Sequence, residues 1–139
     1  MMKMKYKFID TITSDVMFEA YGSTLKDVFA NSAEALFLVM CDIEKVQPKE
    51  KRKIDIKADS VDDLMVNWLQ ALIAAVDIEC MFFSKFEIVE IDEKHLVAFA
   101  WGEEVSAKKG KTVVKAMTYH QYAFKKTAKG YSCRVALDV

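Results

Sequence analysis

The chain has 139 residues, of which 53% are hydrophobic and 29% charged, so we expect one soluble globular domain over residues 1–139. The formal net charge of −1 argues against sequence-blind nucleic-acid binding, which needs an excess of Lys and Arg, although a local basic patch stays open. The three cysteines include no Cys-x-x-Cys pair, which argues against a disulfide framework or a thiol zinc site and favours the reducing cytoplasm. The apolar stretches are too short to span a bilayer, which argues against a membrane location.

The N-terminal part is expected to form two strands and a helix. Residues 6–9 and 16–21 are predicted strands, separated by a polar turn that ends at Asp15. Thr24 begins a capping box, and apolar residues then recur at three- and four-residue steps. This spacing predicts one amphipathic helix whose apolar face belongs to the core.

The middle of the chain is expected to add a short strand and a second helix. Ile54 and Ile56 alternate with charged residues, which is typical of a half-buried strand. The basic run at 49–53 before them could touch phosphate, but an exposed loop and strand edge explain it more simply. Ser60 is a predicted N-cap, and the wide apolar face that follows predicts a helix covering a sheet.

The C-terminal part is expected to consist of strands. A hairpin is predicted from residues 82–91 and 95–101, followed by a basic loop at 105–111 and a closing strand at 131–137. Residues 112–120 are apolar or β-branched on both faces, which predicts a buried central strand. The fold class is therefore α+β, with a largely antiparallel sheet covered by two amphipathic helices.

Charged groups in and near this strand are the candidate functional residues. Lys115 and His120 lie in a strand predicted to be packed, where an ion is costly unless it is paired. Asp138 is a candidate partner, beside the free carboxylate of Val139, and Asp15 joins them if the first and last strands are neighbours. Three carboxylates repel one another without a cation, and oxygen ligands suit calcium or magnesium.

Simpler interpretations exist for each of these residues. Asp15, judged alone, is better explained as a residue that closes a turn. Lys115 either extends to the sheet edge as a structural residue or forms an ion pair whose charge acts on a partner or a phosphate. Strand alternation separates Lys115 from His120, and His95 and His120 lack the spacing of a zinc site. No glycine-rich phosphate loop or catalytic triad is present.

Motifs along essentially the whole chain resemble a known family. They include Asp15-Val16, Ala20-Tyr21-Gly22, Ala35-Leu36-Phe37, Phe83-Ser84-Lys85-Phe86 and Gly102-Glu103-Glu104. The most specific are Val114-Lys115-Ala116-Met117-Thr118-Tyr119-His120 and the ending Leu137-Asp138-Val139. In these motifs the chain is similar to the archease family.

This resemblance implies a function as an accessory protein. Archeases activate the RNA ligase that joins tRNA exon halves during splicing, by promoting its guanylylation and multiple turnover, and are not themselves enzymes. The resemblance implies that Asp15, Asp138 and Val139 bind a divalent cation, calcium in the first place, with magnesium and manganese as alternatives. It implies that Lys115 acts in activating the partner ligase. It allows an indirect contact with tRNA, and leaves open whether RNA is contacted directly.

Two departures from the family pattern, and two other functions, accompany this hypothesis. Ile12 stands where the family has a histidine, and Gln70-Ala71 replace an acidic pair. One alternative is an independent metal-dependent phosphohydrolase, with Asp15 and Asp138 as ligands and His120 as the acid. The other is a chaperone-like module in which the ion is purely structural.

Overall fold

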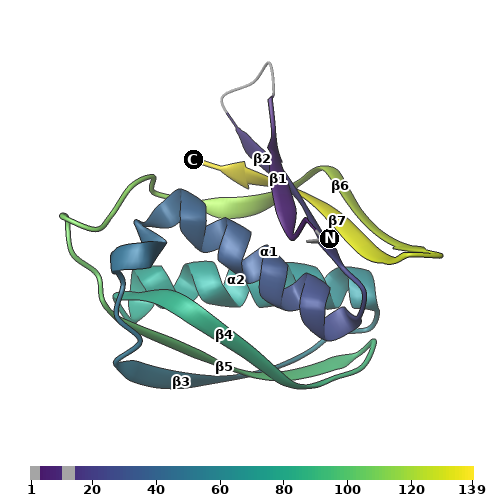
Figure 1. Ribbon diagram of the computed structural model, residues 1–139, viewed down its shortest axis with the longest axis horizontal. Helices are drawn as coiled ribbons and strands as arrows, with labels where there is room; N and C mark the ends of the chain where they lie inside the picture. The colour runs from purple at the N-terminus through teal and green to yellow at the C-terminus, as the bar shows by residue number, and fades with distance from the viewer. Residues whose placement is uncertain (1–3, 11–14) are drawn as a thin grey trace.

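Two antiparallel sheets enclose two helices in the computed structural model, which describes residues 4–10 and 15–139 (Figure 1). One sheet has the strand order β1 (Tyr6–Ile9), β2 (Val16–Gly22), β7 (Gly130–Asp138), β6 (Ala116–Thr127). The other has the order β3 (Glu50–Lys57), β5 (His95–Glu104), β4 (Met81–Ile91). Between them lie α1 (Leu25–Met40) and α2 (Val61–Ile78), and a 3-10 turn (Ile43–Lys45) follows α1.

Both helices begin where the sequence predicts. The Thr24 hydroxyl accepts a hydrogen bond from the backbone N–H of Asp27 at 3.2 Å. The Ser60 hydroxyl accepts one from the backbone N–H of Asp63, also at 3.2 Å. Each cap satisfies a backbone donor that the first helical turn leaves unpaired. Within the described residues, neither helix is long and apolar enough to cross a bilayer.

The core fills the space between the two sheets. α1 packs against β2 and β4, and α2 packs against β6, β3 and β4, so each helix contacts both sheets. Trp68 of α2 is fully buried, and its indole N–H donates to the backbone carbonyl of Phe29 in α1 at 2.9 Å. This bond satisfies the one polar atom of the indole and fixes the two helices against each other.

The α+β class, the antiparallel pairing and the two covering helices are confirmed, with the strands divided between two sheets. The β4–β5 hairpin forms as predicted, with Ile91 opposite Leu96 near its turn. The closing strand pairs with β2 and with β6, so the second predicted strand, which follows Asp15, is the one that lies beside the last strand, and the first is one position further out.

The prediction of a buried central strand at 112–120 is wrong. Residues 112–115 are outside any strand, and β6 is an edge strand of its sheet. The backbone N–H of Thr112 donates to the carbonyl of Val39, at the end of α1, and Val113 is 78% exposed. Only Val114 and Met117 of this stretch are buried. β-Branched composition does not distinguish a central strand from a segment that borders a helix end.

Candidate functional site

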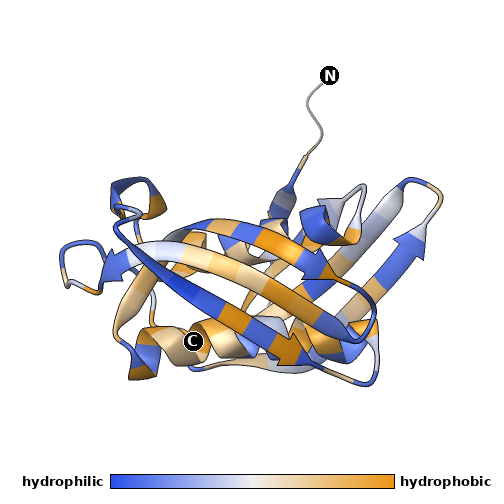
Figure 2. Ribbon diagram, turned by 90° about the horizontal axis from the view of Figure 1, so that it is seen from below, coloured by the Kyte–Doolittle hydropathy of each residue, from blue (hydrophilic) through white to orange (hydrophobic). Residues whose placement is uncertain are grey.

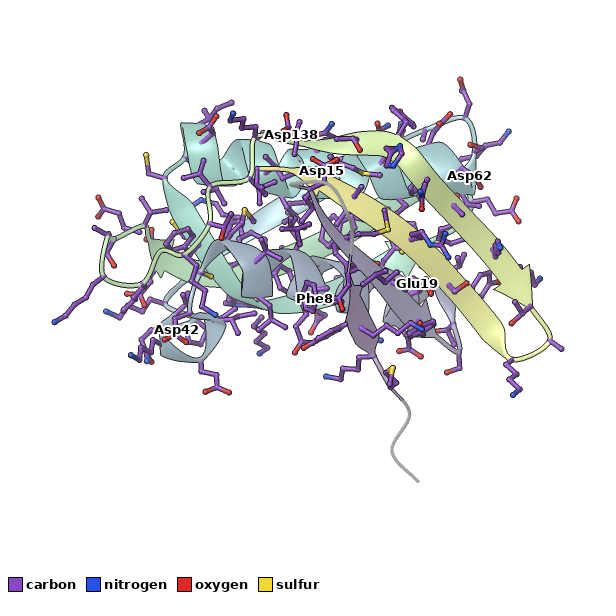
Figure 3. All side chains as sticks on the ribbon, turned by 90° about the horizontal axis from the view of Figure 1, so that it is seen from above. Phe8, Asp15, Glu19, Asp42, Asp62 and Asp138 are labelled. Atoms are coloured by element: carbon purple, nitrogen blue, oxygen red, sulfur yellow. The ribbon has the colours of Figure 1, made fainter. Side chains whose placement is uncertain are left out.

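Three chain segments meet at one end of the four-stranded sheet. β7 lies between β2 and β6, with Val16 opposite Leu137 on one side and Ala116 opposite Asp138 on the other. Continuing the first register by one residue brings Asp15 opposite Asp138. Figure 3 shows the two aspartates beside each other where β2 begins and β7 ends. The predicted approach of Asp15 to Asp138 is therefore present.

Strand alternation directs both aspartates away from the helices. Val135 and Leu137 of β7 are fully buried against the core, so Asp138 belongs to the opposite face. Val16 pairs with Leu137 and packs against the core, which puts Asp15 on the same outward face as Asp138. Both aspartates are half-buried. Their carboxylates thus stand on an accessible face and are aimed by the sheet beneath them.

The backbone of Lys115 is tied to the same place. Its N–H donates to the carbonyl oxygen of Asp138 at 2.8 Å, one residue before β6 begins. Its side chain is exposed, so the expected cost of burying this charge does not arise. Val139 follows Asp138 and packs part of its side chain against the core. Lys115, Asp138 and Val139 are therefore neighbours along a fixed backbone.

His120 stands apart from this group. β6 and β7 lose register between Thr118 and Ala123, where Gln121 has a positive φ of 55°. β6 therefore carries a bulge of several residues. His120 is exposed within this bulge, and its backbone N–H donates to the Thr118 hydroxyl at 3.3 Å. His120 is four residues beyond Ala116, the partner of Asp138, so at the rise per residue of a strand, and with the bulge between them, it lies roughly 7–13 Å from Asp138 along the sheet. His120 is therefore exposed, whereas the prediction of a buried strand had it packed.

Charged side chains continue along the outward face of the same sheet. Glu19 of β2 lies opposite Arg134 of β7, with 3.5 Å between its carboxylate and the guanidinium. Lys7 approaches the same carboxylate at 4.0 Å, and the Tyr21 hydroxyl donates to it at 3.2 Å. Burial, and then the charge of Glu19, raise the pKa of Tyr21. These neighbours balance Glu19, so it is already satisfied beside the aspartate pair.

His95 belongs to the other sheet and has a local partner. Its Nε2 lies 2.7 Å from the carboxylate of Asp55 on the neighbouring strand. This hydrogen bond holds the pKa of Asp55 below its usual value. The pair lies in a different sheet from the aspartates at the end of β7.

Carboxylate oxygens, which hard divalent cations prefer as ligands, lie at this end of the sheet. Asp15 and Asp138 supply two carboxylates, and the terminal carboxylate of Val139 is the third ligand expected from the sequence. Calcium and magnesium take six or more oxygen ligands, so water would complete such a shell. Residues 4–10 and 15–139 contain no group of three or more His, Cys, Asp or Glu side chains suited to a metal. The expected set contains only two such side chains.

The three residues at the two departures from the family pattern add little here. Ile12 lies outside the described residues. Gln70 and Ala71 are half-buried within α2.

Similarity to known proteins extends over nearly the entire chain. A family model described as the Archease protein family matches residues 6–139. The chain belongs to the archease family. Protein archease of Sulfurisphaera tokodaii is 40% identical, over 97% of this chain and 99% of that protein. Protein archease of Methanosarcina mazei is 34% identical, over 97% of this chain and 96% of that protein.

Solved structures agree with this membership. The solution structure of protein 1598 of Methanobacterium thermoautotrophicum matches with a TM-score of 0.80 and 33% identity, over 97% of this chain and 99% of that one. A crystal structure from Thermotoga maritima, of an archease described as a possible chaperone, matches with a TM-score of 0.67. It covers 91% of this chain and 92% of that one at 16% identity, so it supports the fold alone.

One surface was not recognised in the sequence. The middle of β5 has two alanines, Ala98 and Ala100, on its core face and two large aromatic residues, Phe99 and Trp101, on its outward face. Lysines from β3 and β4 lie over these two rings. The signal was the alternation of alanines with large aromatic residues along residues 98–101. A strand covered by helices normally has its large apolar residues on the core face.

Proposed function

We propose that this archease activates a tRNA-splicing RNA ligase, with its activating site at the end of β7. The activator works as an accessory protein and promotes guanylylation and repeated turnover of the ligase. Asp15, Asp138 and the terminal carboxylate of Val139 hold a divalent cation, calcium in the first place. Lys115 supplies the positive charge that acts on the partner.

The observation that carries this proposal is the meeting of Asp15, Asp138 and Lys115 at one sheet end. These residues come from three segments that are far apart in the sequence, and two of them are opposed carboxylates. Carboxylate oxygens on facing strand positions are ligands of the type that a hard divalent cation takes. A function that uses a cation gives a reason for such an arrangement, whereas the core gains nothing from it.

The protein's own residues have separable tasks in this scheme. The pairing of β2, β7 and β6 orients the two carboxylates, and the bond from Lys115 N–H to the Asp138 carbonyl fixes the start of β6 beside them. A cation held there would supply positive charge and fix the relative positions of the three segments. The Lys115 side chain, exposed next to them, is accessible to a carboxylate or phosphate of the partner.

The test is formation of covalent GMP on the ligase. Purified archease is mixed with its cognate ligase, GTP and manganese or magnesium, and ligase guanylylation is followed in single-turnover and multiple-turnover conditions. Wild-type archease should accelerate it, and Asp138→Asn and Lys115→Ala proteins should lose most of that effect. Lys129→Ala is the matched control, because Lys129 is an exposed lysine in the turn at the opposite end of the same β6–β7 hairpin.

The folded state of each variant is checked by circular dichroism and thermal unfolding. Absence of stimulation by the wild-type protein would refute the activator function. Equal stimulation by wild-type, Asp138→Asn and Lys115→Ala proteins would leave the activator function but refute this site.

The two alternative functions have weaker support. A phosphohydrolase needs an acid close to the ligands, and His120 lies too far along β6 for that task. A chaperone-like function is what the description of the Thermotoga maritima protein names. It would require that removal of the cation lower the melting temperature while ligase stimulation stays unchanged.

A further inference from the structure

The outward face of the β3-β5-β4 sheet carries an unusual arrangement of aromatic and basic side chains. In the middle of β5, the residues that face the helices are small: Ala98 and Ala100 are fully buried. Phe99 and Trp101 point the other way and are partly exposed. In the part of the chain that the structure describes, no helix covers this face, and Figure 2 looks directly onto it. Large rings on a solvent face, with alanines on the core face, are not explained by packing.

Lysines flank these rings in register. Trp101 lies opposite Lys51 of β3 and opposite Lys85 of β4. Phe99 lies opposite Lys53 on one side and Glu87 on the other. We name these six residues the aromatic–lysine patch. It contains three lysines and one glutamate, so it is positive although the whole chain has a net charge of −1.

The lysine amines of this patch contact rings rather than carboxylates. The Lys51 Nζ lies 4.0 Å from the centre of the Phe99 ring, and the Lys85 Nζ lies 4.6 Å from the centre of the Trp101 ring. The two rings are 6.1 Å apart. In the described part of the chain the ion pairs use other basic residues, so the three lysines keep their charge available for a ligand.

We propose that the aromatic–lysine patch binds a single-stranded nucleic acid, with bases stacked on Phe99 and Trp101 and phosphates on the flanking lysines. A sheet face with exposed rings and adjacent amines is the arrangement by which proteins hold unpaired bases. Stacking of a base is stronger than an exposed contact between an amine and a ring, so the amines move from the rings to the phosphates.

A single strand fits this patch better than a duplex or an acidic peptide. A duplex keeps the faces of its bases inside the stack, so it would leave the rings without a partner. An acidic peptide would use the lysines but has no planar group for two neighbouring rings. The patch lies on the sheet across the helices from Asp15 and Asp138, so its occupation is independent of the proposed activating site.

The test is titration of a fluorescein-labelled, mixed-sequence single-stranded RNA of about 12 nucleotides, a length within the range that one such platform covers. Fluorescence anisotropy at several salt concentrations gives Kd and its salt dependence. Intrinsic fluorescence gives a second readout, because the chain has two tryptophans and Trp68 is fully buried. Stacking should therefore quench the emission of Trp101.

The variants separate stacking from charge. Trp101→Ala should weaken binding by about five-fold or more with an unchanged salt slope. Lys51→Ala and Lys85→Ala should each lower the slope of log K against log salt by about 0.7, because each removes one phosphate contact. Lys57→Ala is the matched control. Lys57 is an exposed lysine on the same face of β3, but it lies opposite His95, away from the rings, and its loss should change neither quantity.

Three results would overturn the proposal. The first is that the RNA does not bind at low salt. The second is that duplex RNA binds at least as tightly as the single strand. The third is that polyglutamate binds as tightly as RNA and the emission of Trp101 is not quenched. The last result would assign the patch to an acidic protein segment.

Discussion

Replacing Asp138 by Asn should have opposite consequences in the absence and presence of a divalent cation. Residues directly opposite in an antiparallel pair have Cβ atoms about 5 Å apart, so the carboxylates of Asp15 and Asp138 lie at a similar separation. Two unit charges at that distance repel by about 1 kcal/mol in a solvent-exposed environment. With the cation chelated, Asp138→Asn relieves this repulsion and should raise the melting temperature by about 3 °C.

With the cation present the order should reverse. A ligand at roughly 100 times its Kd stabilises the folded state by about 2.7 kcal/mol, which corresponds to about 8 °C for a chain of this size. Wild-type protein should gain this stability in calcium and the Asn variant should not. The measurement is thermal unfolding by circular dichroism in EDTA and in calcium, magnesium or manganese chloride.

An Asp59→Asn protein is the control for this experiment. Asp59 is an exposed aspartate just before α2, so its replacement should leave the response to calcium at the wild-type value. The reasoning fails if wild-type protein responds to none of the three cations. It also fails if Asp138→Asn lowers stability in EDTA as much as in calcium, because the carboxylate would then be a structural group.

Two further predictions concern the fold. Ser60→Ala should lower the free energy of unfolding by about 1 kcal/mol, because the N–H of Asp63 loses its cap, and urea denaturation would measure the loss. A thiol reagent at pH 8 should modify only the exposed Cys80 in the native protein, because burial raises the pKa of Cys41 to about 12 and that of Cys133 to about 11. A thiol with a raised pKa stabilises the folded state below its unfolded pKa and loses that contribution as pH rises, so stability should decline from about pH 9 to pH 11. Rapid labelling of all three thiols in native protein, or no such decline, would contradict the burial of Cys41 and Cys133.

Local features of the fold could be predicted from the sequence because their causes are local. Thr24 and Ser60 begin helices since a hydroxyl at that position satisfies a backbone N–H three residues on. The alternation of apolar and charged residues around Ile54 defines a half-buried strand within β3 in the same way. Each of these signals involves fewer than about ten residues, and none depends on what the segment later packs against.

Strand order could not be predicted because it depends on pairing between distant segments. β7 enters between β2 and β6, and this insertion makes β6 an edge strand. Composition alone gave residues 112–120 a central position, since it cannot show that Thr112 instead bonds to the end of α1. The bulge around Gln121 contains no glycine that would indicate it in the sequence, so the exposure of His120 could not be predicted either.

The same strand order explains why the candidate site can be changed without loss of the fold. Leu137 and Val135 face inward from β7 and are fully buried, so they hold the sheet against the helices. Asp138 alternates with them and faces outward, so it contributes oxygen atoms rather than packing. Replacing Leu137 by Ala would therefore lower stability by about 2–5 kcal/mol and remove any activity with it. Replacing Asp138 by Asn removes one charge and no buried surface. Variants at outward positions are for this reason the ones that can separate an activating role from the need for a folded chain.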